Sequence, residues 1–260
     1  MYPPERIVCL TEETTETLYL LGEQDRIVGV SGYTVRPPQA RREKPRVSAF
    51  ISADIPKILA LRPDLVLTFS DLQADIVASL IRAGVAVHAF NQRTVAEILG
   101  MIRTLGALVG AQDRAEDLAT RLAANLEDTR RRAAQRRDRP KVYFEEWDEP
   151  MISGIAWVSE LIEAAGGTDI FPELAICKSA KDRIVTREEV IQRAPDIIVG
   201  SWCGKKFKQE KVVARPGFEI VPAVRNERLH EIKSPLILQP GPAALTDGLA
   251  ALEAIISSPR

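Results

Sequence analysis

The sequence has few of the residues and motifs that mark enzymes, metalloproteins and membrane proteins. Three cysteines in 260 residues are an odd number, which disfavours a disulfide framework. There is no H-E-x-x-H, G-x-S-x-G, Walker or Cys-x-x-Cys motif. With 45% hydrophobic and 27% charged residues, the composition is typical of a soluble globular protein. We therefore expect no catalytic residues, no metal-binding residues, no covalent cofactor and no insertion into a membrane.

An excess of charge of either sign is also missing. The 35 basic and 36 acidic residues give a formal net charge of -1, so no global field attracts the chain to nucleic acid. The arginine-rich stretch "EDTRRRAAQRRDRP" is interpreted as the solvated face of a helix rather than as a nucleic-acid-binding patch. We expect a monomer without a nucleic-acid partner.

No export signal is visible at the N-terminus. The segment "MYPPERIVCL" reaches a strand-like apolar run within six residues of Met1, without a charged region followed by a longer apolar one. If Met1 is the native start, the expected location is the cytoplasm. A mature chain whose signal had been removed would look the same, so the periplasm is the alternative.

The first hundred residues alternate between short apolar runs and helical periodicity. Runs of Val, Ile and Leu bounded by Gly, Pro or Asp are typical of strands buried on both faces, and their alternation with helices predicts a parallel sheet. We expect strands at 7–10, 27–30, 65–69 and 85–90, and helices at 14–21, 55–61 and 73–83.

A long helix separates this first part from a second α/β part. Helical patterns cover 95–109 and 113–137, and the second extends over ~38 Å at ~1.5 Å per residue. After Pro140, strands are expected at 141–144, 197–199 and 229–232, with helices at 157–165, 187–193 and 243–256. The sequence thus predicts two Rossmann-like lobes with mainly parallel sheets, assigned to 1–109 and 140–260 and joined by a helix within 110–139.

One arrangement occurs in both parts. In "LRPDLVLTFSD" and "RAPDIIVGSWC" a helix ends before proline, which disfavours the helical conformation of the preceding residue, and an apolar strand follows. The two strands are followed by Ser70-Asp71 and by Gly200-Ser201. Ligands of open α/β sheets bind at the carboxyl ends of strands, so the repeat predicts a ligand-binding cleft formed by two such edges.

Several segments together resemble a known family. In order, "RIVCLTEETTETLYLLGEQDRIVGVS", "IPKILALRPDLVLTFSD", "LIRAGVAVHAF", "RTLGALVGAQDRAEDLA", "ELIEAAGGTDIFPE", "VTREEVIQRAPDIIV" and "RLHEI" resemble the periplasmic-binding-protein family of cobalamin and iron-siderophore ABC importers, and especially its cobalamin-binding branch. The resemblance implies the class III fold, in which a single rigid helix joins two lobes. It implies that a cobalamin-like or other metal-chelate ligand is held between them, with limited closure.

The resemblance also implies a protein partner. Members of the family that deliver ligand to an ABC permease place one acidic residue on each lobe to meet arginines of the permease. Glu188 matches this position in the second lobe, but Pro56 stands at the position in the first lobe. Proline cannot form the ion pair, so Asp54 is the candidate substitute.

Aromatic side chains make up only 5% of the sequence, so their placement is informative. A large, flat, partly apolar ligand needs rigid aromatic walls and a few polar groups. Tyr33 and Phe50 lie in the predicted loop between the second and third strands, Trp147 follows the first strand of the second lobe, and Trp202 follows the repeated strand. The alternative is that these rings fill the interior.

Charged groups are expected at the same strand ends. Acids crowd the ends of both first strands, and lysines and Arg183 oppose them, a mixture that suits a zwitterionic or amide-rich ligand. Glu12 has a second interpretation, because a carboxylate stabilises a helix N-terminus. Cys203 offers a thiol that can ligate metal, although no second ligand stands at metal spacing. The candidate ligand-binding residues are Glu12, Tyr33, Phe50, Asp71, Glu145, Glu146, Trp147, Arg183, Trp202, Cys203 and Lys205.

The leading interpretation is a non-catalytic solute-binding protein for a cobalamin-like or metal-chelate ligand. Two alternatives remain open. One is a cytoplasmic chelatase-like or cofactor-processing enzyme, suggested by the sharing of such folds between binders and enzymes. The other is a conventional periplasmic component of an ABC importer.

Overall fold

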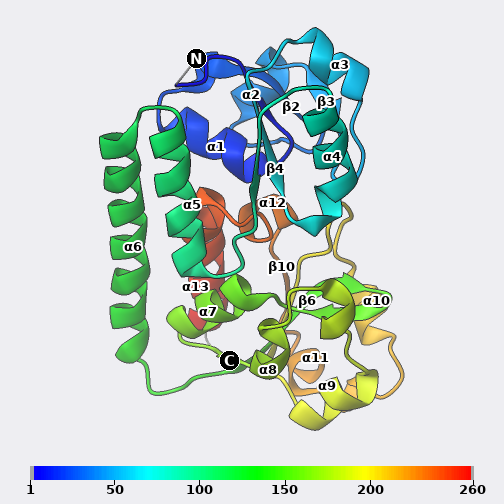
Figure 1. Cartoon of the computed structure of the whole chain (residues 1–260). Helices are drawn as coiled ribbons and strands as arrows, with labels where there is room; N and C mark the ends of the chain where they lie inside the picture. The colour runs from blue at the N-terminus through cyan, green and yellow to red at the C-terminus, as the bar shows by residue number, and fades with distance from the viewer. Residues whose placement is uncertain (1–2, 259–260) are drawn as a thin grey trace. The chain divides into compact units, whose positions relative to one another are not determined.

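The computed structural model describes residues 3–258, which form two compact units. Unit 1 contains the chain up to Gln92 together with Ala96–Leu122, and unit 2 contains Arg93–Val95 and the chain from Ala123 onward. Helix α6 (Gln112–Ala134) is continuous across the boundary (Figure 1). The predicted α/β fold with one long helix is therefore confirmed, and the boundary between the units falls inside that helix.

Unit 1 is built on a five-stranded, all-parallel sheet with the order β3-β2-β1-β4-β5. The central strands carry apolar side chains on both faces, and Val8, Val66, Ile58 and Leu80 belong to one buried cluster. The strands are β1 (Ile7–Cys9), β2 (Ile27–Ser31), β3 (Arg46–Ser48), β4 (Leu65–Phe69) and β5 (Val87–Phe90). The helices are α1 (Glu12–Leu20), α2 (Pro38–Glu43), α3 (Ile55–Ala60), α4 (Ala74–Arg82) and α5 (Val95–Leu108), and α5 begins in unit 2.

Strand β3 corrects the prediction for the segment between the second and third expected strands. Its three residues contain one buried apolar side chain, Val47, so no alternating pattern marks it. Because β3 intervenes, Tyr33 and Phe50 do not share one loop. Tyr33 follows β2 and Phe50 follows β3.

Unit 2 contains a second sheet with the order β10-β9-β6-β7, and β8 lies off this path, paired with Lys141 and Val142 at the start of β6. Only β7 runs antiparallel, so the sheet is mainly parallel as predicted. The strands are β6 (Lys141–Asp148), β7 (Met151–Ser153), β8 (Thr168–Asp169), β9 (Ile197–Gly200) and β10 (Leu229–Glu231). The helices are α7 (Ala156–Ala164), α8 (Pro172–Ala175), α9 (Arg187–Arg193), α10 (Gln209–Val213), α11 (Pro222–Arg225), α12 (Ser234–Ile237) and α13 (Leu249–Ser257).

Strand β6 is four residues longer than the predicted 141–144. Its second half pairs with β7, where Trp147 lies opposite Ile152 and Asp148 lies opposite Met151. The prediction that Trp147 follows the strand is therefore wrong, because a short hairpin partner extends it. The last predicted helix also differs, since a π-helical turn, Ala244–Gly248, precedes α13.

The repeated proline-aspartate turn has the same geometry in both units. The residue before proline adopts a left-handed conformation, with φ +48° at Arg62 and φ +50° at Ala194. The aspartate carboxylate then holds the start of the first strand. In unit 1, Asp64 accepts hydrogen bonds from the backbone N of Glu5 at 2.8 Å and of Arg6 at 2.9 Å. In unit 2, Asp196 accepts one from the backbone N of Lys141 at 2.9 Å.

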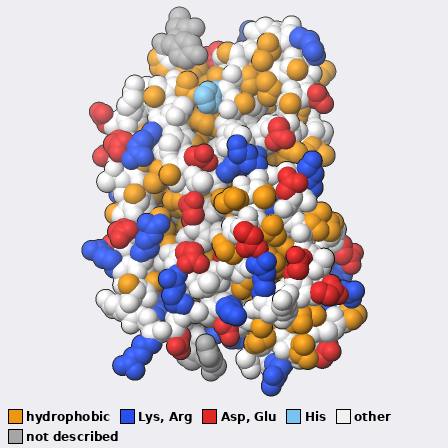
Figure 2. Space-filling view, turned by 60° about the horizontal axis from the view of Figure 1, so that its bottom comes forward, with side chains coloured by type: hydrophobic (Ala, Val, Ile, Leu, Met, Phe, Trp, Pro, Cys, Tyr) orange, Lys and Arg blue, Asp and Glu red, His pale blue; other side chains and the backbone are white. Residues whose placement is uncertain are grey.

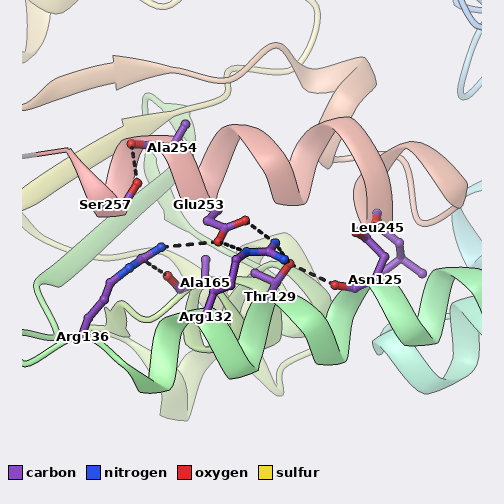
Figure 3. Close-up of polar contacts among 9 residues, drawn as sticks. All are labelled: Asn125, Thr129, Arg132, Arg136, Ala165, Leu245, Glu253, Ala254 and Ser257. Carbon is purple, nitrogen blue, oxygen red and sulfur yellow. Dashed lines mark hydrogen bonds and ion pairs between the residues drawn. The ribbon is translucent and has the colours of Figure 1, made fainter.

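Within unit 2, the second half of α6 is attached to α13 by polar contacts (Figure 3). Arg132 donates to both carboxylate oxygens of Glu253, at 2.8 and 2.7 Å, and Arg136 lies 3.4 Å from the same carboxylate. Asn125 donates to the carbonyl of Leu245 in the π-helical turn at 2.9 Å. Part of the arginine-rich stretch therefore serves packing within unit 2.

Charges of both signs are interspersed on the molecular surface. On the face drawn in Figure 2, Lys and Arg side chains alternate with Asp and Glu side chains. Arg130 and Arg131 form ion pairs with Glu127 and Asp128 of the same helix. Among the described residues, no helix combines the length and the apolar character needed to cross a membrane.

Replacing Glu253 with Gln should lower the melting temperature by about 2–4 °C at neutral pH, because it removes a charge shared by two arginines. Arg132 holds the pKa of Glu253 below its usual range, so this contribution is present above that range and is lost as pH falls through the lowered pKa. Thermal unfolding followed by circular dichroism measures the change. The matched control is Glu127→Gln, whose carboxylate forms one exposed pair at 3.4 Å. Equal melting temperatures for both variants would contradict the prediction.

Candidate functional site

The carboxyl ends of the parallel strands in unit 1 present aromatic and apolar side chains. Tyr33, two residues after β2, is 52% exposed, and Phe50, two residues after β3, is half-buried. Asp71 is exposed at the start of the 3-10 turn that follows β4. Two further apolar side chains at these strand ends, Ile51 at 70% exposed and Leu72 at 58%, were not selected from the sequence. This edge of unit 1 therefore offers a mainly apolar surface that also carries the acidic Asp71.

Gln73 fixes the loops of this edge. Its side-chain Oε1 accepts a hydrogen bond from the backbone N of Phe69 at 2.9 Å, and its Nε2 donates to the carbonyl of Phe50 at 2.8 Å. The side chain is fully buried. Sequence reasoning missed Gln73, because no local motif links it to a loop 23 residues earlier.

The acids after β1 are buried rather than presented to solvent. Glu12 and Glu13 begin α1 and are 6% and 1% exposed. Burial raises the pKa of Glu12 to about 7 and that of Glu13 to about 8, and the Thr11 hydroxyl, which donates to Glu13 at 2.7 Å, opposes part of the second shift. Glu12 lies in the first turn of α1, but burial disfavours the ionised carboxylate that its second interpretation requires.

In unit 2, Glu145 is the centre of a buried polar cluster. Arg215 donates to its two carboxylate oxygens at 2.6 and 2.9 Å, and the indole N–H of Trp202 donates to Oε1 at 3.0 Å. Glu145 is fully buried and Trp202 is 2% exposed. The carboxylate and the indole therefore hold each other in place, and the ring edge of Trp202 packs on Phe207. Arg215 was not predicted, since it lies 70 residues from Glu145 without a motif.

A second ion pair joins Glu146 to Arg183. The guanidinium donates to the carboxylate at 2.6 and 3.2 Å and also contacts the carbonyl of Ser153. The side chain of Arg183 is 2% exposed, whereas that of Glu146 is 21% exposed. Arg183 therefore connects β6 and β7 to the turn Ala180–Arg183 instead of reaching solvent.

Lys205 lies against two tryptophans. Its Nζ is 3.8 Å from the centre of the Trp147 ring and 5.2 Å from that of Trp202, and it forms an ion pair with Asp148. Trp147 is half-buried, and its N–H donates to the carbonyl of Glu149 at 2.9 Å. The exposed Cys203 lies in the same loop as Lys205. Beside them, a cavity of ≈ 430 Å³ opens at the carboxyl ends of β9 and β10.

The predicted site residues thus fall into two groups. A side chain with almost no exposed surface cannot touch a ligand without rearrangement, and this applies to Glu12, Glu145, Arg183 and Trp202. The accessible or partly accessible group consists of Tyr33, Phe50, Asp71, Glu146, Trp147, Cys203 and Lys205. Within residues 3–258, no three His, Cys, Asp or Glu side chains are grouped so as to hold a metal ion.

The predicted docking residues Asp54 and Glu188 lie at the starts of α3 and α9. Pro56 is the second residue of α3 and Glu188 is the second residue of α9, so they occupy matching positions in the repeat. Asp54 is the N-cap of α3, where its carboxylate accepts a hydrogen bond from the backbone N of Lys57 at 3.0 Å. Asp54 and Glu188 are both exposed.

Comparisons with known proteins identify the family and the fold. The model of the family described as "Periplasmic binding protein" matches residues 7–236. A vitamin B12-binding protein of Vibrio cholerae is 28% identical over 253 residues, covering 94% of this chain and 86% of the relative. An uncharacterized ABC transporter substrate-binding lipoprotein of Bacillus subtilis, YvrC, is 25% identical over 258 residues, covering 96% of this chain and 79% of the relative. The apo structure of the periplasmic heme-binding protein RhuT from Roseiflexus sp. RS-1 superposes with a TM-score of 0.82 at 25% identity, covering 97% of this chain and 99% of that one.

Replacing Glu13 with Gln should flatten the pH dependence of stability. Between its usual pKa of 4.5 and the raised value of about 8, the folded protein retains a proton that the unfolded chain releases. Stability therefore falls as pH rises, by up to ~1.4 kcal/mol per pH unit for this group, and the variant loses this slope. Urea unfolding at several pH values from about 5 to 8 measures it. The exposed Glu5→Gln is the control, and an unchanged slope in Glu13→Gln would refute the prediction.

Replacing Glu145 with Gln should destabilise the protein by about 3–5 kcal/mol, because Arg215 then keeps a partly buried charge without its carboxylate. Removing both charges, in Glu145→Gln with Arg215→Met, should recover at least half of the loss. Urea unfolding of the two single variants and the double variant gives the coupling free energy. If the losses of the two single variants simply add in the double variant, the pair is not coupled as described.

Proposed function

Since this chain belongs to the periplasmic binding protein family, we propose that it is a non-catalytic solute-binding protein for a cobalamin-like or other metal-chelate ligand. The relatives named for vitamin B12 and for heme support this ligand class, because both molecules are large metal chelates with a flat macrocycle. Membership of a family of binding proteins favours ligand binding over catalysis, and this argues against the chelatase-like alternative.

The observation that carries the proposal is the placement of aromatic side chains in each unit. Both sheets end, at their carboxyl edges, in accessible rings: Tyr33 and Phe50 in unit 1, and Trp147 in unit 2. Rigid rings of this kind bind flat apolar ligands at little entropic cost. We propose that these rings contact the ligand, together with Asp71, Glu146, Cys203 and Lys205.

The buried members of the predicted site have a supporting role in this proposal. Glu145 holds Trp202 and Arg215, and Arg183 holds Glu146. Glu12 begins α1 beneath the edge of unit 1. A ligand surface needs such support, because a side chain displaced by 1 Å no longer matches its ligand.

The family also bears on the cellular location of the protein and on the permease that would receive its ligand. The description of the family and the name of the Bacillus subtilis relative support a protein outside the cytoplasm that works with an ABC permease. We therefore propose the periplasmic alternative in place of the cytoplasmic expectation. The proposed docking residues are Glu188 and Asp54, since Pro56 offers no charge. Fractionation of the native cells tests the location.

Titration with cyanocobalamin, hemin and a ferric hydroxamate siderophore, followed by tryptophan fluorescence, tests the function. At least one of them should give a saturable change with one ligand bound per chain. For that ligand, Trp147→Ala should weaken binding about tenfold, as loss of a central aromatic contact does. The control is Ile220→Ala, an exposed apolar residue of unit 2 outside the strand ends. The absence of a saturable response to all three ligands would remove the proposal.

A further inference from the structure

We propose that the ligand of this protein carries free carboxylate groups, and that Lys206 and Lys233 of unit 2 bind them. The inference rests on the proposed function, because it specifies the chemistry of the same ligand. It concerns the cavity at the carboxyl ends of β9 and β10, which lies wholly within unit 2.

A cluster of cations lines the cavity, and the nearly buried Trp202 also borders it. Its volume of ≈ 430 Å³ can take part of a large ligand but not the whole of it. Its wall includes Trp202, and its charged and hydroxyl lining consists of Lys205, Lys206, Glu231, Lys233 and Ser234. Three ammonium groups therefore stand beside one carboxylate.

The acids near the end of β6 are already paired within the protein. Glu145 is bound by Arg215, Glu146 by Arg183, and Asp148 by Lys205. Lys211 lies 3.6 Å from the same Asp148 carboxylate as a second partner. The acidic side chains that the sequence suggested for ligand binding are thus engaged in ion pairs within the protein.

The cations that remain are Lys206 and Lys233. Both are exposed, and within the described part of the chain neither forms an ion pair with a carboxylate. Glu231 offsets only part of this charge: its Oε1 accepts a hydrogen bond from the backbone N of Phe207 at 3.0 Å, and among the described residues no lysine forms an ion pair with its carboxylate. Because both residues line the cavity, an anion bound there would be attracted by two positive charges.

This arrangement distinguishes between chelates of similar size. A chelate whose rim carries only amides offers no net negative charge to the two lysines. A rim with free carboxylates offers charge-assisted hydrogen bonds, which are roughly twice as strong as neutral ones. The cavity therefore favours acid-bearing chelates over amidated ones, which narrows the ligand class of the proposed function.

Zinc protoporphyrin IX and its dimethyl ester test the inference, because they share ring and metal and differ only in two carboxylates. The free acid should bind more tightly than the ester, and Lys206→Gln and Lys233→Gln should each weaken binding of the acid about fivefold while leaving the ester unaffected. Lys206→Arg and Lys233→Arg, which keep the positive charge, should retain most of the affinity for the free acid. Lys57→Gln, on α3 of unit 1, is the matched control. Raising NaCl from about 50 to about 500 mM should weaken binding of the acid only.

The outcomes separate the two proposals. Equal affinity for acid and ester, or lysine variants that bind the acid as the unchanged protein does, would overturn the inference and leave the binding function standing. Saturable binding of cyanocobalamin without binding of zinc protoporphyrin IX would also overturn the inference and leave the binding function standing. The absence of saturable binding by the porphyrins, cyanocobalamin, hemin and the hydroxamate siderophore would overturn both.

Discussion

Each unit depends on one aspartate carboxylate that joins a turn to the first strand of its sheet. Asp64 and Asp196 accept backbone hydrogen bonds at the starts of β1 and β6. In both units a basic side chain near the start of this strand also binds the end of the helix that precedes the turn. Arg6 donates to the carbonyl of Leu61 at 3.1 Å, and Lys141 donates to that of Arg193 at 3.3 Å. Helix end, turn and first strand are thereby fixed as one piece. The register of β1 with β4 and of β6 with β9 follows, so their carboxyl ends meet at one edge.

Much of this scaffold could be predicted because local sequence patterns, such as apolar runs and prolines, mark its strands and helices. The limits of β4 and α9 match the expected 65–69 and 187–193, since a mainly apolar run marks the strand and a proline closely follows the end of the helix. Strand β3 escaped prediction because it has one buried apolar residue. The second half of β6 escaped because its partner β7 contains three residues, and pairing rather than composition extends the strand.

The candidate site was less predictable, because side-chain partners come from distant parts of the chain. The sequence places Glu145 and Trp202 at strand ends, but it contains no sign that Arg215 turns both inward. Arg183 carries a full charge and would normally be assigned to the surface, yet two acceptors near β6 and β7 hold it in the interior. Tyr33 and Lys205 are exposed in the loops after β2 and β9, and Trp147 is half-buried although it lies in β6 and pairs with Ile152 of β7.

Internal neutralisation gives the two carboxyl edges different chemistry. In unit 1, burial raises the pKa values of Glu12 and Glu13, which favours their neutral forms, and the accessible side chains are mainly apolar, as in Ile51 and Leu72, with the acidic Asp71 beside them. In unit 2, the acids are paired, and the surplus charge on the cavity is positive. On the proposed function, the edge of unit 1 suits an apolar face of a ligand, and the cavity of unit 2 suits an acidic rim. Discrimination among metal chelates would then rest on the rim, because a flat apolar face is common to many of them and free carboxylates are not.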